Sequence, residues 1–224
     1  MAAESRQAIV CVGLALEAKI AARQFRRERG ALNLTDFSGE GCAAVSDCRA
    51  IVSFGLAGGL SPELRAGDIV IASCVVGRNG SFATDDVWSE RLLTAIPTAF
   101  YAPILGVESP LGVSAERREL GVRAGALAVD MESHIVGQVA SRNLMRFVAV
   151  RVVIDTVERD IPQAAVACLS NNGETRMSRL GCLLLERPTD TLDVLRLCAN
   201  WLLAREALVN CCEVLSASVR QIGL

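Results

Sequence analysis

The chain has 224 residues, a net charge of −2 and a hydrophobic fraction of 51%. This length suits one large domain with a substantial core and leaves little room for another, so we expect a single domain over residues 1–224. Arg and Lys are scattered, with no basic stripe interleaved with aromatic residues. This pattern argues against nucleic acid as a partner and favours a small molecule.

The sequence also narrows the expected cellular location and the expected use of metals and disulfides. The best apolar run, 147–154, is short and interrupted by Arg151, so we expect no membrane span. The N-terminus lacks a signal-peptide layout, which predicts a cytoplasmic protein. The nine cysteines include no CxxC pair, and we expect reduced thiols packed as small hydrophobic groups, Cys11 and Cys198 among them. A single histidine, His134, is too few for a zinc cluster, and we expect no metal and no cofactor.

Short apolar runs that predict strands alternate with helical patterns along the chain. The predicted strands are 8–12, 31–37, 49–54, 67–72, 101–107, 126–129 and 147–154, and the predicted helices are 16–29, 88–96, 116–122 and 132–142. Residues 175–215 are almost wholly helical in pattern, with a break at Pro188. The alternation predicts an α/β fold: a largely parallel mixed sheet flanked by helices, with a helical C-terminal tail.

One connection in this scheme is unusual. Residues 38–49 barely provide the dozen residues that a helical crossover requires, so we expect them to be irregular. In such sheets ligands bind at the carboxyl ends of the strands. The residues that follow each predicted strand are therefore the candidates for a site.

Three segments place glycine or acidic residues at that edge. Residues 55–60 hold three glycines, which let backbone N–H groups approach an anion or a sugar, although a tight turn without ligand explains them about as well. Asp130 and Glu132 stand at the start of a predicted helix, where both are explained as helix-capping or dipole-compensating residues. Alternatively, Glu132 binds the vicinal hydroxyls of a sugar. Asp155 either caps the next segment or, with its pKa raised by burial, serves as a general acid. We expect Arg151 to be a buried structural partner of a carboxylate.

The order and spacing of these motifs resemble those of the methylthioadenosine/adenosylhomocysteine nucleosidase and purine nucleoside phosphorylase superfamily. The motifs are the glycine segment continued by Gly67-Asp68-Ile69-Val70, the triplet Met131-Glu132-Ser133, and Val150-Arg151-Val152-Val153-Ile154-Asp155. Within the superfamily the chain is most similar to the hopanoid-associated phosphorylase branch, on residues 52–60 and 125–134 and the helical tail after Pro188. The resemblance covers nearly the whole chain.

The resemblance implies cleavage of the N-glycosidic bond of an adenosine-type nucleoside, such as adenosylhopane, with release of adenine. It implies that Asp155 protonates or hydrogen-bonds the purine at N7, that Glu132 holds the ribose hydroxyls and that Met131 packs under the sugar. It also implies a homodimer or a larger closed homo-oligomer. The residues expected to line the ribose and nucleophile pocket are Ala57, Gly58 and Gly59.

The attacking group stays open at this point. Nucleosidases of the superfamily place a water-activating Glu after the first strand, and the matching position here is Glu17 or Lys19, depending on the register. Lys19 would bind inorganic phosphate as a cosubstrate, whereas Glu17 would activate water and repel phosphate. Alternatively, neither residue has a role in the reaction, and both side chains are exposed to solvent on a helix. We expect phosphate, because the most similar branch is named for phosphorolysis.

Two other classes of function compete with this hypothesis. A catalytically silent ligand-binding relative is favoured by residues 107–111, which offer no match to the purine-stacking aromatic residue of the family. A dinucleotide-dependent oxidoreductase is disfavoured, because no GxGxxG follows the first strand. Release of adenine separates the enzyme hypothesis from both.

Overall fold

The computed structural model describes residues 8–12, 15–25, 32–36, 48–166 and 191–221. Its strands are β1 (Ala8–Val12), β2 (Leu32–Asp36), β3 (Ala50–Gly59), β4 (Ile69–Gly77), β5 (Gly80–Ala83), β6 (Phe100–Gly106), β7 (Ala128–Asp130) and β8 (Arg146–Asp155). Its helices are α1 (Ala15–Phe25), α2 (Asp86–Ala95), α3 (Ser114–Ala124), α4 (Ser133–Arg142), α5 (Gln163–Val166) and α7 (Thr191–Gln221).

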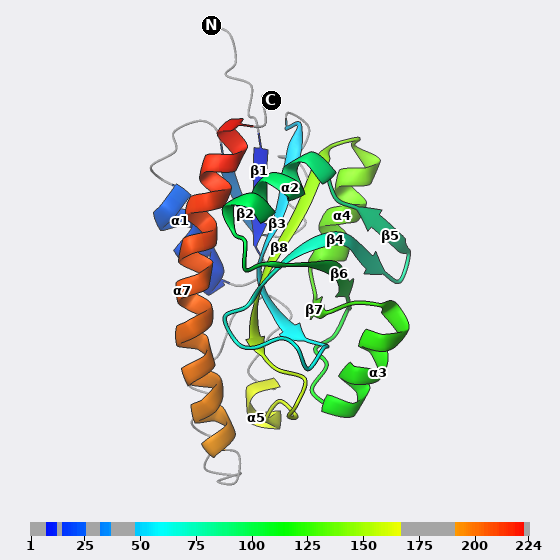
Figure 1. The fold of residues 1–224 in the computed structure, drawn as a ribbon, viewed down its shortest axis with the longest axis vertical. Helices are drawn as coiled ribbons and strands as arrows, with labels where there is room; N and C mark the ends of the chain where they lie inside the picture. The colour runs from blue at the N-terminus through cyan, green and yellow to red at the C-terminus, as the bar shows by residue number, and fades with distance from the viewer. Residues whose placement is uncertain (1–7, 13–14, 26–31, 37–47, 167–190, 222–224) are drawn as a thin grey trace, which may run out of the picture.

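The strands form one mixed sheet in the order β2-β1-β3-β7-β6-β4-β5, and β8 bridges β3 and β4 (Figure 1). Five of these strands close on themselves, because β3 pairs with β8, β8 with β4, β4 with β6, β6 with β7, and β7 with β3. Most pairings are parallel, while β7 runs antiparallel to β3, and β4 runs antiparallel to both β5 and β8. The predicted single α/β domain with a largely parallel mixed sheet and flanking helices is confirmed.

Both faces of the sheet are buried, and alternate residues enter different cores. In β1, Val10 belongs to one apolar cluster and Ile9 to the other, and in β8 the same division separates Val150 from Ala149. Side chains of successive strand residues point to opposite faces, so a strand covered on both sides reads as a continuous apolar run. This is why the strands were recognisable without polar alternation.

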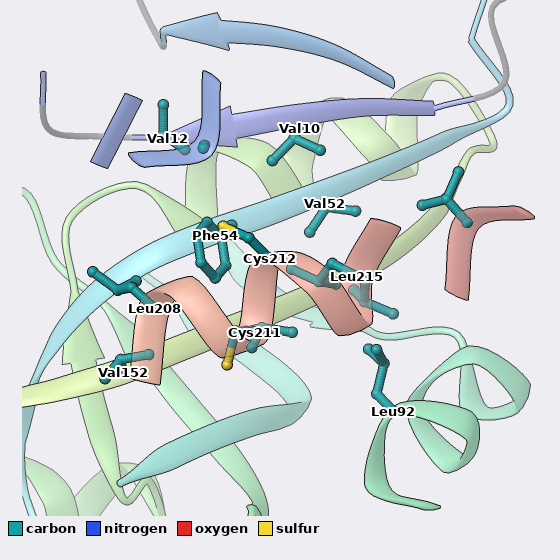
Figure 2. Close-up of a cluster of buried hydrophobic side chains, with 14 of the residues drawn as sticks. Val10, Val12, Val52, Phe54, Leu92, Val152, Leu208, Cys211, Cys212 and Leu215 are labelled. Atoms are coloured by element: carbon teal, nitrogen blue, oxygen red, sulfur yellow. The ribbon is translucent and has the colours of Figure 1, made fainter. Parts of the chain in front are cut away.

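The long helix α7 covers one face of the sheet (Figure 1). Figure 2 shows Leu208, Cys211, Cys212 and Leu215 of α7 lying against side chains of β1, β3 and β8, with Leu92 of α2 beside them. Both cysteines of the pair are fully buried and free. Burial raises the pKa of each of these thiols to about 12, which keeps them protonated and supports the packing role.

The structure corrects several sequence-based expectations. Residues 55–59, expected in a glycine turn, continue β3, because Gly58 and Gly59 pair with β7. The hairpin strand β5 was not predicted, and Cys198 is exposed rather than packed. The expectations for residues 38–47 and for the helix before Pro188 lie outside the described residues. Within the described part of the chain, no helix is both long and apolar enough to cross a membrane.

Helices α2 and α7 are joined by a buried hydrogen bond. The indole Nε1 of Trp88, a fully buried residue, donates to Ser218 Oγ at 3.0 Å, and Ser218 Oγ in turn donates to the carbonyl of Leu215 at 2.8 Å. Ser89, one residue along α2, is buried too, but its Oγ has no hydrogen-bond partner among the described residues. The two serines therefore form a natural comparison.

We predict that Ser218→Ala lowers the free energy of unfolding by about 1–3 kcal/mol, because it leaves the buried indole N–H without an acceptor. Ser89→Ala, which removes a buried hydroxyl that satisfies no partner, is expected to leave stability unchanged or to increase it. Urea unfolding of both variants measures the difference. Equal losses would show that the Trp88–Ser218 bond does not support the packing of α7.

Candidate active site

A buried arginine, Arg151, lies in the middle of β8 opposite Gly55 of β3. Its side chain is 1% exposed, and its Nη2 lies 2.5 Å from Asp130 Oδ2 at the end of β7. Nη2 also donates to Ser53 Oγ at 2.7 Å. An ion removed from water must be paired and hydrogen-bonded, so these contacts are what permit a guanidinium inside an apolar strand.

Ser133 completes the surroundings of this arginine and begins helix α4. Its backbone N–H donates to Asp130 Oδ2 at 3.1 Å and its Oγ donates to the same oxygen at 2.5 Å. Arg151 donates to Ser133 Oγ from Nε at 3.2 Å and from Nη2 at 3.0 Å. Asp130 therefore satisfies the start of α4, as the capping hypothesis predicted, and also neutralises Arg151.

Glu17 approaches the same arginine from the first turn of α1. The residue is 2% exposed, and its Oε1 accepts the backbone N–H of Leu56 at 2.7 Å. Gly55 makes this approach possible: a Cβ there would stand 2.5 Å from Arg151 Nη1 and 2.7 Å from Glu17 Oε2. A side chain at position 55 is thus incompatible with the arrangement.

Glu132 is the third carboxylate around Arg151. Its Oε2 lies 3.8 Å from Arg151 Nη2, and its side chain is 26% exposed. Burial raises the pKa of Glu132 to about 7, with Asp130 and Glu17 adding to the rise and Arg151 opposing it. Burial alone would lower the pKa of Arg151, but the three carboxylates together raise it above its usual range.

Asp155 ends β8 a short distance along the chain from Arg151. The register advances by two residues on β8, from Val153 to Asp155, for one on β3, which is the signature of a bulge that re-aims a side chain. Both carboxyl oxygens then lie 3.4 Å from the point where a Cβ of Gly58 would stand. Gly58 lies between Asp155 of β8 and Val129 of β7, the residue that precedes Asp130.

The Asp155 carboxylate forms an ion pair with Arg117 of α3. Burial raises the pKa of Asp155 to about 6, and the charge and hydrogen bond of Arg117 oppose that rise. A pKa in this range suits a carboxyl for general acid catalysis near neutral pH.

The arrangement has two chemically different ends. Around Arg151 three carboxylates surround one guanidinium, which leaves excess negative charge beside any bound molecule. Such charge stabilises a cationic, oxocarbenium-like sugar. At the other end the carboxyl of Asp155, whose pKa is raised to about 6, lies against Gly58 and is suited to donate a proton.

The residues singled out from sequence occupy different places in this arrangement. Glu17, Glu132 and Asp155 lie at the site described above, Ala57 is buried in β3, and the half-buried Met131 links β7 to α4. The structure does not bring Lys19 to the site, because it is exposed on α1 two residues beyond Glu17. The polar residues not assigned to the site from sequence are Ser53, Arg117, Asp130 and Ser133.

The raised pKa values predict how stability depends on pH. Both carboxyls bind protons more tightly in the folded chain than in the unfolded one, so their contribution to stability is greatest at acidic pH. That contribution is lost as pH rises towards about 7. Thermal unfolding should therefore give a lower Tm at pH 8 than at pH 5.

Asp155→Asn combined with Glu132→Gln should shrink that difference in Tm, because neutral amides no longer titrate. The exposed Glu63→Gln serves as the control and should behave as the parent protein does. A difference in Tm that is unchanged in the double variant would contradict the raised pKa values.

The same architecture occurs in solved nucleosidase structures. The chain aligns with futalosine hydrolase of Helicobacter pylori at a TM-score of 0.69 and 10% identity, over 97% of this chain and 98% of the other. It aligns with apo 5′-methylthioadenosine nucleosidase of Arabidopsis thaliana at a TM-score of 0.67 and 14% identity, over 97% of this chain and 96% of the other. An adenine complex of the 5′-methylthioadenosine/S-adenosylhomocysteine nucleosidase of Colwellia psychrerythraea aligns at 0.59 and 16% identity, over 68% and 83%.

At these identities the solved structures establish the fold alone. No curated protein sequence matches the chain significantly. The family is established by sequence, because residues 30–186, well over half of the chain, match the family described as the phosphorylase superfamily. The protein therefore belongs to the phosphorylase superfamily.

Proposed function

We propose that the protein hydrolyses the N-glycosidic bond of an adenosine-type nucleoside. Water attacks C1′ of the ribose as Glu17 accepts its proton, and the bond from C1′ to N9 of the purine breaks. Asp155 gives a proton to N7 of the departing base, so the products are the free sugar and adenine. The reaction requires a base for the nucleophile and an acid for the leaving group, and the proposal assigns these roles to Glu17 and Asp155.

The observation that carries this proposal is the burial of Glu17 beside Arg151, with Lys19 exposed on the same helix. The sequence-based argument for phosphate depended on Lys19 standing at the nucleophile position. A site with three carboxylates around one guanidinium repels a phosphate dianion, whereas it tolerates neutral water. Hydrolysis is therefore favoured over phosphorolysis.

The partial exposure of Glu132 supports a role for it as the ligand of the sugar. It is the most exposed of the three carboxylates around Arg151, and it adjoins Met131 at the end of β7. A carboxylate accepts hydrogen bonds from two vicinal hydroxyls at once. This supports the assignment of Glu132 to the ribose hydroxyls.

Phosphorolysis is the second candidate, and one observation favours it. Arg151 Nη1 is buried and has no hydrogen-bond partner among the described residues. An unpaired guanidinium N–H is a donor that an anionic oxygen could accept. Phosphate bound there would need Glu132 in its protonated form.

The resemblance in sequence motifs supports finer assignments within the proposal. They are a place in the hopanoid-associated branch with adenosylhopane as substrate, a cytoplasmic protein without a cofactor, and a homodimer or larger homo-oligomer. Chromatography of the products from adenosylhopane tests the substrate. Light scattering at micromolar concentration tests the assembly, and a monomer would refute it.

We predict that Glu17→Gln lowers kcat by about a hundredfold or more, because an amide cannot take the proton of water yet still accepts the Leu56 N–H. Lys19→Gln on the same helix is the control and should keep normal turnover. The assay follows adenine and the sugar product with and without inorganic phosphate. Ribose 1-phosphate formed only with phosphate, together with a loss in Lys19→Gln, would replace hydrolysis by phosphorolysis.

A further prediction concerns the sugar. Glu132→Gln should raise KM and lower kcat for ribosides, but should affect 2′-deoxyribosides less, because the proposed partners of Glu132 are the two vicinal hydroxyls. Steady-state kinetics on matched pairs of substrates provide the comparison. An equal loss on both members of a pair would assign Glu132 to the support of Arg151 instead.

A further inference from the structure

A second buried arginine, Arg117, lies at the end of the site away from Arg151. It is fully buried on α3, whereas the adjacent Arg118 is exposed. Its Nη1 donates to Asp155 Oδ2. Its Nη2 donates to two main-chain carbonyls, that of Thr156 at 3.0 Å and that of Arg159 at 2.5 Å.

The segment that follows β8, residues 156–161, also forms hydrogen bonds at the start of α3. Ser114 N donates to Asp160 Oδ1 at 2.7 Å, and Ser114 Oγ donates to the carbonyl of Val157 at 2.5 Å. The N–H of Ile161 donates to the carbonyl of Gly112 at 2.8 Å. Helix α3 and the segment after β8 therefore form one connected unit, and Arg117 joins that unit to the carboxyl of Asp155.

This contact distinguishes the two oxygens of Asp155. In a neutral carboxyl the carbonyl oxygen is a better acceptor than the hydroxyl oxygen, so the Arg117 hydrogen bond to Oδ2 favours the proton on Oδ1. The carboxyl lies against Gly58, where an added Cβ would stand 3.4 Å from both of its oxygens. Without Arg117, either oxygen would carry the proton and the carboxyl would be free to rotate.

We propose that Arg117 is a positioning residue, which holds Asp155 over Gly58 with Oδ1 as the proton-bearing oxygen. The inference rests on the proposed function, in which Asp155 protonates the departing base. Arg117 is placed to act through Asp155, and no contact of its own with the substrate is needed.

The charges around Asp155 make the inference measurable. Arg117 is the charged side chain that contacts Asp155 within the described part of the chain; β3 and β7 face it with Gly58 and Val129. Glu158, Arg159 and Asp160, on the segment that follows β8, are exposed to solvent. Removing Arg117 removes the influence that opposes burial, so the pKa of Asp155 should rise further. Because the reaction needs protonated Asp155, activity should then persist to higher pH.

The test compares Arg117→Met, which keeps the length and apolar stem, with Arg118→Met on the same turn. Titration of Asp carboxyls by 13C NMR follows Asp155 directly, and Asp155→Asn identifies its resonance. We expect the Asp155 titration and the alkaline limb of kcat/KM to move to higher pH in Arg117→Met, while kcat at pH 6 falls about tenfold to a hundredfold. Arg118→Met should change none of these, and Arg117→Lys should restore the position of the limb.

An Asp155 titration and an alkaline limb that both stay in place in Arg117→Met would overturn the inference, as would the same changes in Arg118→Met. If the methionine variant does not fold, Arg117→Gln, which keeps a donor and loses the charge, is titrated instead with the same expected shift. If the parent protein releases no base from any nucleoside, the proposed function fails. The NMR titration still decides whether Arg117 controls Asp155 in that case.

Discussion

The burial of Arg151 is the constraint on which the rest of the site depends. A guanidinium enclosed by apolar strands is tolerated only where carboxylates and hydroxyls compensate for lost water. Asp130, at the end of β7, and Glu17, at the start of α1, meet that requirement by lying close to Arg151 in the middle of β8. Gly55 supplies the space in which they meet. Loss of Asp130 would remove the closest ion-pair partner of this buried guanidinium.

In the proposed reaction the two ends of the site have different electrostatic roles in breaking the bond between the sugar and the base. Carboxylates gathered around Arg151 favour positive charge on the sugar, while Asp155 favours a proton on the base. Both needs are met by acidic residues, and their surroundings give them different roles. Burial raises the pKa of both groups, and each is opposed by a guanidinium: Arg151 beside Glu132 and Arg117 beside Asp155.

Sequence patterns predicted the fold, and they singled out Glu17, Glu132 and Asp155 as candidates for the site, but not Arg117 or Asp130. Buried strands read as apolar runs. Asp155 stood out because it directly follows such a run, and Glu132 because it follows another run by a few residues. Arg151 interrupts an apolar run, which indicates that it is buried and paired with a carboxylate. The sequence does not indicate which carboxylate. Arg117 carried no signal, because α3 also contains the solvated Arg118. The choice between Glu17 and Lys19 required the actual turn of α1, since two residues on a helix point in nearly opposite directions.

The closed set of five strands governs how the chain reaches its native state. Ser53 and Arg151, which share a hydrogen bond in the finished sheet, are 98 residues apart in sequence. Contacts between distant segments form late, since loop closure must precede them, and they slow folding. During synthesis β3 leaves the ribosome long before β8 and α7 exist to cover it. The candidate site is therefore complete only after β8, which carries Arg151 and Asp155, has joined the sheet.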